Sequence, residues 1–163
     1  MAGWLVVDHF PFLSNIHPII YIHPYPTHTG YVYTWGESSY GQLGLGPDVV
    51  ARNSSPLPRR VLLLNDTDAA NAPLVAAQIS CGGMHTGAVT ADGRLYMWGR
   101  GDNGQLGVGR LGREDLASMG GVYGGCVGLS APALVDPACF ESPVKQVGKG
   151  SGKGWGLAVW CDN

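Results

Sequence analysis

The strongest constraint on how this chain folds is an internal repeat. The stretch Tyr31–Gly46 recurs without a gap as Arg94–Gly109, at a constant offset of 63 residues, as from Trp35 to Trp98. Both copies contain Tyr-x-Trp-Gly followed by Gly-Gln-Leu-Gly. Repeats at a fixed spacing are typical of architectures in which each unit buries its apolar face against a neighbour. Every other feature of the chain is therefore interpreted against this repeat.

Within each copy, the residue pattern predicts a β-strand followed by a compact glycine turn. Large side chains alternate at Tyr31, Tyr33 and Trp35, as expected of a strand with one buried face. Asp92-Gly93 lies between two β-prone runs, which is typical of a hairpin turn that requires positive φ. With 26 glycines, 11 prolines and only 13% charged residues, the composition favours strands and turns over helices.

The positions that define the repeat are predicted to form its structural framework rather than a ligand site. A ligand site need occur only once, whereas a strand-to-turn device is needed in every unit. Trp35 and Trp98 are accordingly predicted to be core residues. The predicted framework consists of Tyr33, Trp35, Gly36, Gly41, Leu43, Gly44, Cys81, Gly82, His85, Asp92, Gly93, Tyr96, Trp98, Gly99, Gly104, Leu106 and Gly107.

The repeat divides the chain into a divergent N-terminal arm, residues 1–28, and a repeat region, residues 29–163. The repeat region is predicted to hold a half repeat at 29–64, a full repeat at 75–135 and a truncated repeat at 142–163. Stacked repeats that lack a neighbour expose apolar faces, so we expect further chain or another subunit to complete the assembly.

Several segments carry more local predictions. Ile19–Ile22 is a β-prone run of the arm and is predicted to pair with the Tyr31–Trp35 run. Pro56–Leu64 is predicted to be a proline-led strand that enters the next unit. Asp48–Ser55 and Arg110–Gly128 are predicted to be surface loops, the second with a charge cluster. Further strands are predicted at Val75–Cys81, Ser130–Val135, Ser142–Val147 and Leu157–Val159.

Motifs for catalysis or nucleotide binding are weak in this chain. Gly99–Gly104 fits GxGxxG after a strand, but Gln-Leu-Gly follows where a dinucleotide-binding fold needs a helix. Gly148–Gly154 lacks the first glycine and the hydroxyl residue of a phosphate-binding loop. His85 has no legible nucleophile or carboxylate partner, so a structural role is predicted. We expect no catalytic, cofactor-binding or metal-binding residues, and no cofactor.

Charge and cysteine usage exclude further classes of function. A formal net charge of −2 provides no basic field for nucleic acid. The four cysteines, Cys81, Cys126, Cys139 and Cys161, show neither zinc-ligand spacing nor a disulfide framework. The N-terminal apolar run contains polar residues and proline, unlike a signal peptide or a membrane span. We expect an intracellular protein, cytoplasmic or nuclear, that binds neither nucleic acid nor membrane.

The segment Ile79–Gly107 reads Ile-Ser-Cys-Gly-x-x-His-x-x-Ala-Val-Thr-x-Asp-Gly-x-Leu-Tyr-x-Trp-Gly and ends in Gly-Gln-Leu-Gly. It resembles the repeat of the regulator of chromosome condensation (RCC1) family, and the resemblance extends to residues 29–46 and, in degraded form, 142–162. It implies an all-β fold, a seven-bladed β-propeller whose blades are four-stranded antiparallel sheets. The chain would supply about two to three blades, an incomplete ring.

These features predict a non-enzymatic scaffold for protein–protein interaction, because variable loops on a rigid framework commonly carry binding specificity. The alternative implied by the resemblance is a part of a guanine-nucleotide exchange factor for a small GTPase, although no motif identifies an exchange residue. The candidate interaction residues lie in the two predicted loops and are Asp48, Arg52, Arg110, Arg113, Glu114 and Asp115.

Overall fold

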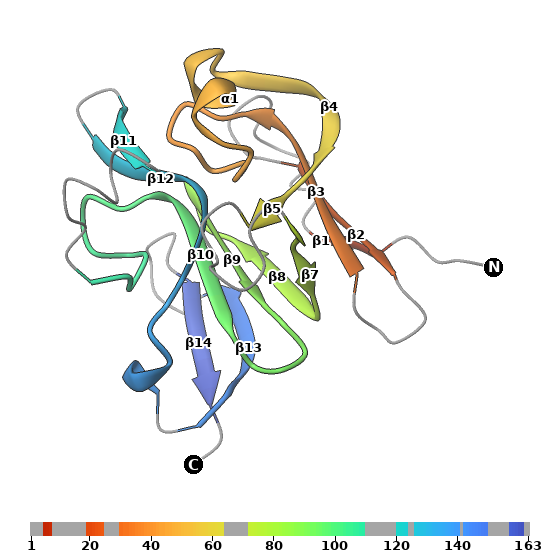
Figure 1. Cartoon of the computed structure of the whole chain (residues 1–163), viewed down its shortest axis with the longest axis vertical. Coiled ribbons are helices and arrows are strands. Elements are labelled where there is room, and N and C mark those ends of the chain that lie inside the picture. The colour runs from red at the N-terminus through yellow and green to blue at the C-terminus, as the bar shows by residue number, and fades with distance from the viewer. Residues whose placement is uncertain are drawn as a thin grey trace.

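A computed structural model shows a set of antiparallel sheets that lie side by side and are joined by turns (Figure 1). The all-β fold class predicted from the repeat is confirmed, and the sheets have the antiparallel order of propeller blades. The structure describes residues 5–7, 19–24, 30–63, 72–109, 120–123, 126–140, 142–149 and 157–161.

The first sheet is built around β3 (Gly30–Glu37), the strand of the first repeat copy. On one side, β2 (Ile19–Pro24) pairs with β3, and β1 (Leu5–Val7) pairs with β2. On the other side, β4 (Ser54–Arg60) pairs with most of β3, while β7 (Val75–Ala76) pairs with its first residues. The sheet therefore has the order β1-β2-β3-β4, with β7 paired to the start of β3 off this path.

The second sheet contains the strand of the second repeat copy, β10 (Leu95–Arg100). It pairs with β9 (His85–Val89), which pairs with β8 (Gln78–Cys81). On its other side β10 pairs with β12 (Cys126–Leu134), which pairs with β11 (Gly120–Tyr123). The predicted Asp-Gly hairpin turn connects β9 and β10, and its glycine has a φ of 83°. These strands form one blade with an added outer hairpin strand.

Two smaller strand pairs complete the described residues. β13 (Val144–Lys149) pairs with β14 (Leu157–Cys161), and β13 packs against β8 and β9 of the second sheet. β5 (Leu62–Leu63) pairs with β6 (Ala72–Pro73). A 3-10 helix, η1 (Pro137–Cys139), connects β12 to β13 and begins at a cap whose Asp136 side chain accepts a hydrogen bond from the Ala138 amide.

The pairing predicted for Ile19–Ile22 of the N-terminal arm is confirmed. The prediction that the Pro56–Leu64 strand enters the next unit is wrong. Ile19 lies opposite Trp35 and Ile22 opposite Val32 in the β2–β3 register. Pro56–Leu64 does form strands, but β4 stays in the first sheet as the neighbour of β3 rather than entering the next unit. Prolines tolerate this outer position because their missing N–H groups face away from a ladder.

The main core lies between the first and second sheets. Val32 and Leu74 from the first unit and Tyr96 and Trp98 from the second are at most 1% exposed and belong to one apolar cluster. Burying such side chains removes apolar area from water at about 25 cal/mol per Å². The two units are therefore joined by a continuous core.

Trp35 is less buried than the repeat predicts. Every residue from Leu95 to Gly99 in β10 is buried, whereas in β3 the buried residues alternate and Trp35 is only half-buried. The two predicted core tryptophans therefore differ in burial, with Trp98 fully buried and Trp35 only half-buried. The glycine loop of the first unit covers Trp98, because a Cβ added at Gly44 would lie 2.7 Å from Trp98 Nε1.

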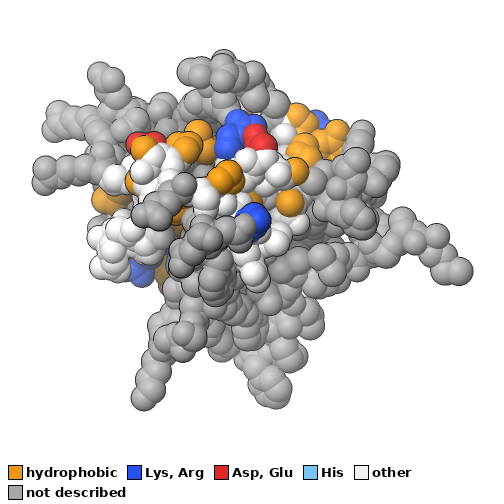
Figure 2. All heavy atoms as spheres, turned by 90° about the horizontal axis from the view of Figure 1, so that it is seen from below, with side chains coloured by type: hydrophobic (Ala, Val, Ile, Leu, Met, Phe, Trp, Pro, Cys, Tyr) orange, Lys and Arg blue, Asp and Glu red, His pale blue; other side chains and the backbone are white. Residues whose placement is uncertain are grey.

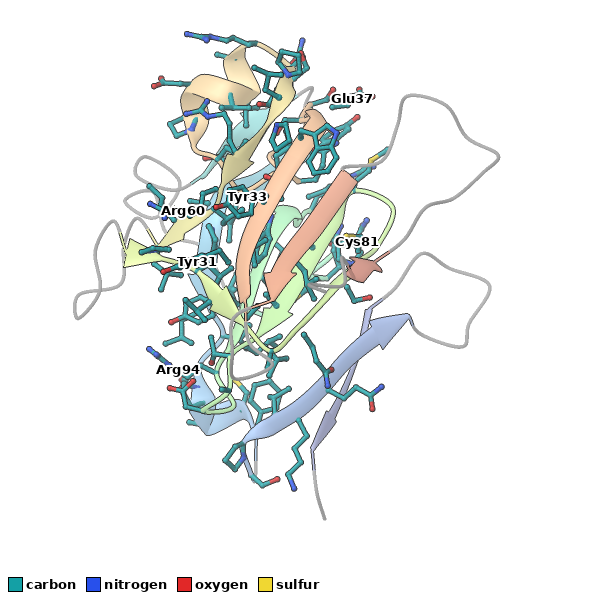
Figure 3. All side chains as sticks on the ribbon, turned by 90° about the vertical axis from the view of Figure 1, so that its right-hand side faces the viewer. Tyr31, Tyr33, Glu37, Arg60, Cys81 and Arg94 are labelled. Atoms are coloured by element: carbon teal, nitrogen blue, oxygen red, sulfur yellow. The ribbon has the colours of Figure 1, made fainter. Side chains whose placement is uncertain are left out.

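The half-buried face of β3 carries aromatic side chains covered by arginine. The Arg60 guanidinium of β4 lies 5.3 Å from the centre of the Tyr31 ring, and Arg60 is opposite Tyr33 in the strand register. Figure 3 shows these three side chains together on one side of the first sheet. Such cation–π contacts at exposed sites stabilise a fold by about 0.5–1 kcal/mol each.

The segment predicted as the loop Asp48–Ser55 contains a short helix. α1 (Pro47–Ala51) follows the N-cap residue Gly46, has proline in its first turn, and buries Val49 and Val50. β4 then begins at Ser54, inside the predicted loop. Proline is favoured in the first helical turn because its missing N–H would have no partner there, and the two valines secure the helix by burial.

The predicted loop Arg110–Gly128 is also partly regular. Its last part forms β11 and the start of β12, which pair as an antiparallel hairpin. This glycine-rich segment has no alternation of apolar and polar residues, so its sequence does not predict strands. They form because β12 pairs with β10. Residues 110–119, which include the predicted charge cluster, lie outside the described residues.

Candidate interaction surfaces

The glycine loop of the first repeat, residues 38–46, is a compact series of turns. Gly41 and Gly44 have φ values of 81° and 68°, which glycine adopts without strain. The Gly44 amide donates to the Gly41 carbonyl at 2.9 Å, and the Tyr40 amide donates to the Gln42 side-chain oxygen at 2.9 Å. The loop is thus held partly by hydrogen bonds within itself.

One buried carbonyl of this loop accepts two hydrogen bonds from the second unit. The Gln42 backbone oxygen accepts hydrogen bonds from Trp98 Nε1 at 2.9 Å and from Thr86 Oγ1 at 3.0 Å. Trp98 and Thr86 are opposite one another on β10 and β9. Within the first unit, Thr34 Oγ1 donates to the Leu43 carbonyl at 2.7 Å. We call this contact between residues 38–46 and the Thr86–Trp98 pair the indole joint.

The indole joint uses residues that the sequence prediction missed. Trp98, Gly41 and Gly44 are predicted framework residues, but Gln42 and Thr86 are not, although both are at most 1% exposed. The recurrence of Gln42 as Gln105 was a readable signal. Thr86 carries no comparable signal, because only the β9–β10 register places its hydroxyl beside the indole.

A Thr86→Val substitution should measure the hydroxyl contribution to this joint. Valine preserves the branched shape but removes the donor to Gln42, whose carbonyl keeps the Trp98 bond. We expect the free energy of unfolding to fall by about 1 kcal/mol, as is usual for a lost hydrogen bond. Urea denaturation would check this, and an unchanged midpoint would show that the Thr86 hydroxyl adds nothing to the joint.

His85, adjacent to the joint in sequence, is buried and has an unpaired ring nitrogen. It is 5% exposed, and no hydrogen-bond partner for Nε2 is found among the described residues. A Cβ added at Gly82 would lie 2.3 Å from the His85 ring, so the ring packs directly on that glycine. Burial lowers the pKa of His85 below its ordinary value of 6.5. The arrangement favours a packed, neutral imidazole.

The lowered pKa of His85 predicts a specific loss of stability in acid. Because the unfolded chain binds the proton more tightly, this contribution is fully present above about pH 6.5 and is lost as pH falls below it. We expect the free energy of unfolding of the wild type to decrease between pH 7 and pH 5 more steeply than that of His85→Gln, by up to about 1.4 kcal/mol per pH unit. Denaturant titrations at several pH values would show it.

The comparison with His85→Gln separates His85 from the other histidines. The side chains of His9, His17, His23 and His28 lie outside the described part of the chain. Their contributions are common to both proteins and cancel in the difference. Parallel pH profiles for the two proteins would contradict the burial of a neutral His85.

The ends of β3 and β10 carry a small polar cluster. Arg100 donates through Nε and Nη2 to the Asp102 carboxylate, at 2.7 and 2.8 Å. These bonds lower the pKa of Asp102 to about 2. The Arg100 guanidinium also lies 5.4 Å from the centre of the Tyr40 ring in the loop of the first unit, and it contacts Met84 Sδ. The cluster connects the two units at their solvent-exposed edge.

α1 lies at the same end of the molecule. Asp48 and Arg52 are exposed, and α1 packs against β4 and β12, while the Gly46 amide donates to the Ser130 carbonyl of β12 at 2.8 Å. Figure 1 shows α1 and the β11–β12 hairpin at this end. The structure therefore brings the first predicted loop next to the described part of the second. The other candidate residues, Arg110, Arg113, Glu114 and Asp115, lie outside the described residues.

The opposite end has a shallow groove of about 270 Å³ between the β9–β10 turn and η1. Asp92 accepts hydrogen bonds from Thr90 and Arg94, and the Thr90 bond is the main cause of the lowered pKa of Asp92. Val135, Phe140 and Val144 supply apolar lining. Viewed from below, the described side chains are mostly uncharged (Figure 2). The described lining of the groove thus contains the Asp92–Arg94 ion pair beside an apolar wall.

The described residues lack two further kinds of feature. No group of three or more histidine, cysteine or acidic side chains in that part of the chain is placed to hold a metal ion. None of the helices described there has the length and apolar character needed to cross a membrane.

Comparison with known proteins gives a consistent result. The family model of the regulator of chromosome condensation (RCC1) repeat matches residues 29–89 and 92–151, and a second model of this repeat matches 76–105. Human E3 ubiquitin-protein ligase HERC2 is 32% identical over 111 residues, covering 68% of this chain and 2% of that protein. Human RCC1 domain-containing protein 1 is 33% identical over 118 residues, covering 56% of this chain and 30% of that protein.

Solved structures show the same fold. Yeast RCC1 (Prp20), in its complex with Kap60, aligns with a TM-score of 0.57 and 20% identity over 83% of this chain and 26% of that chain. Human WBSCR16 aligns with a TM-score of 0.53 and 24% identity over 81% of this chain and 27% of that chain. This chain therefore spans less than a third of each of these relatives.

Proposed function

Because the chain belongs to the RCC1 repeat family, we propose that it is a non-enzymatic β-propeller segment that serves as a scaffold for protein–protein interaction. The repeated side chains are engaged in holding the units together, as Trp98, Thr86 and Gln42 are in the indole joint. Partner specificity is then left to the connecting segments, which vary between repeats and lie at the surface.

The observation that carries this proposal is the convergence of two connecting segments on one end of the sheets. α1 contacts β12, and Asp48 and Arg52 are exposed beside it. The Arg100–Asp102 pair and Tyr40 lie at the same strand ends. Charged and aromatic side chains that surround a rigid framework are suited to polar, protein-type contacts. We call the surface formed by Asp48, Arg52, Tyr40, Arg100 and Asp102 the strand-end surface.

A charge-reversal experiment tests this surface. The full chain carrying Asp48→Lys with Arg52→Glu should capture its cellular protein partners at least tenfold less than the wild type, because reversed rim charges repel a complementary partner. The measurement is quantitative crosslinking of tagged protein in cells. Arg59→Glu on the exposed face of β4 is a matched control in a different place.

The outcomes distinguish the surface from general damage. Because Asp48, Arg52 and Arg59 are all exposed, the wild type, the double variant and Arg59→Glu should have equal thermal stability. Partners lost with Arg59→Glu but kept with the double reversal would place binding on β4 and contradict the proposal. Deletion of residues 110–128 is unsuitable as a test, since it would remove β11 and the first residues of β12.

The second candidate function is guanine-nucleotide exchange on a small GTPase, and family membership alone supports it. Exchange would use a protein surface to favour the nucleotide-free state of the GTPase rather than covalent chemistry. Accelerated release of labelled GDP from a panel of purified small GTPases would support it, and unchanged release would exclude exchange activity on those GTPases. We propose an intracellular site of action for either function.

A further inference from the structure

Met84 and Arg100 lie side by side, the first just before β9 and the second at the end of β10. The Arg100 backbone amide donates to the Met84 carbonyl at 2.8 Å, which holds the two backbones together. From the side chain, Arg100 Nη1 donates to Met84 Sδ at 3.6 Å. Because a thioether sulfur is a weak acceptor, one nitrogen of the guanidinium is engaged in a weak bond only.

The rest of this guanidinium is held by stronger contacts. Nε and Nη2 donate to the Asp102 carboxylate at 2.7 and 2.8 Å. The central carbon of the guanidinium lies 5.4 Å from the centre of the Tyr40 ring. These contacts position Nη1 beside the sulfur without depending on it. A charged donor that is already positioned forms a strong hydrogen bond with a good acceptor placed there.

The two methionines whose side chains the structure describes differ in their access to solvent. Met84 is half-buried, whereas Met97 is 3% exposed and belongs to the apolar core cluster. Oxidation of a thioether follows its exposure and gives a polar sulfoxide. Met97 sulfoxide would place that oxygen among apolar side chains, while Met84 sulfoxide would have a guanidinium beside it.

We propose that Met84 is a site of oxidation by peroxide and that Arg100 binds the resulting sulfoxide. A lone pair of Sδ attacks one oxygen of hydrogen peroxide, and the O–O bond breaks to give S–OH⁺ and hydroxide. The proton passes from the first to the second, so the products are the sulfoxide and water. Sulfur loses two electrons and the peroxide gains them. Rotation about Cγ–Sδ then carries the oxygen to Nη1, where a charge-assisted hydrogen bond replaces the weak one.

This modification goes beyond the binding role proposed above and does not require it. Arg100, Asp102 and Tyr40 belong to the strand-end surface, so the sulfoxide would add a polar group beside that surface. Methionine sulfoxide reductases reverse the reaction, which makes the change reversible. Either proposal can fail without affecting the other.

Peptide mapping by mass spectrometry tests the oxidation step. The full chain is treated in its folded state with dilute hydrogen peroxide, quenched and digested. Met84 sulfoxide should form at least about tenfold faster than Met97 sulfoxide, because Met97 is buried. In concentrated urea, which unfolds the chain, the two rates should become equal. A folded chain in which Met84 is oxidised no faster than Met97 would overturn the assignment.

The shift of the thermal midpoint on oxidation tests the role of Arg100. Oxidation should lower the midpoint of Arg100→Leu by about 2–4 °C more than that of the wild type, because the sulfoxide has lost its donor. Arg94→Leu is the matched control, since Arg94 also pairs with an aspartate and stacks on a tyrosine. It should show the wild-type shift. Each protein is compared with the same protein carrying Met84→Leu, which subtracts oxidation of the other methionines.

A measurement on the wild type covers the case in which Arg100→Leu does not fold. In NMR spectra, the side-chain N–H signals of Arg100 should move downfield when Met84 is oxidised, and those of Arg94 should stay in place. Equal midpoint shifts for the wild type and Arg100→Leu, or unchanged Arg100 signals, would overturn the binding of the sulfoxide by Arg100.

Discussion

Trp98→Ala is expected to lower the free energy of unfolding by about 3–5 kcal/mol, the usual cost of truncating a fully buried tryptophan. The side chain is 0% exposed, and its Nε1 donates to Gln42 in the neighbouring unit. Truncation would leave a cavity in the core and remove a buried hydrogen bond at once. A single domain of this size is commonly stable by only about 5–15 kcal/mol, so the variant should be close to unfolded at 37 °C.

The repeat provides its own control for this prediction. Trp35 occupies the equivalent position in the first copy but is half-buried. Trp35→Ala should therefore cost about 2 kcal/mol or less, because less apolar area leaves water on folding there. Urea denaturation of both variants, with Trp98→Phe as a milder change, would give the ranking. Equal losses for the two alanine variants would contradict the indole joint as the main link between the units.

Gly41→Ala should also be strongly destabilising. A Cβ there would lie 2.6 Å from the Leu129 carbonyl oxygen and 2.8 Å from Ser130 Cα, both backbone atoms of β12 that cannot rotate away. The residue would also be held at a φ of 81°, which costs a non-glycine residue about 1–2 kcal/mol. With about 1–3 kcal/mol for overpacking, a total loss of about 2–5 kcal/mol follows.

Gly104→Ala separates the steric cost of the added Cβ from the cost of a positive φ. Its φ of 75° is close to that of Gly41, but no atom of the described residues lies within 4 Å of its added Cβ. It should lose only the conformational part, about 1–2 kcal/mol. Differential scanning calorimetry of the pair would measure the steric cost of the junction as a difference. If both variants had the same midpoint, the first loop would not be packed against β12 in solution.

The repeat in the sequence predicted the fold because periodicity and glycine placement are local signals. The strands around Trp35 and Trp98, the Asp92-Gly93 turn and the pairing of Ile19–Ile22 all follow from alternation and turn chemistry. These predictions needed no knowledge of distant contacts. The structure confirms them in β2, β3, β9 and β10.

Other features depend on contacts between residues far apart in the chain, so the sequence alone could not show them. The unequal burial of Trp35 and Trp98 follows from which glycine loop covers which strand. Thr86 becomes part of the joint only through the β9–β10 register. α1 is short, and helices of this length are stabilised by packing, here of Val49 and Val50, rather than by propensity. The role of the predicted charge cluster in binding stays a prediction, because its residues lie outside the described part of the chain.

The exchange rate of the Trp98 Nε1 proton with solvent deuterium is the most direct test of the indole joint. If Trp98 donates to the Gln42 carbonyl in a buried junction, this proton should exchange only through unfolding or separation of the units, at least about a thousandfold more slowly than an exposed indole. Thr86→Val should accelerate it, and Gly44→Ala should do so more strongly. Exchange of the wild-type Trp98 proton at the rate of an exposed indole would contradict the joint and the assembly of units built on it.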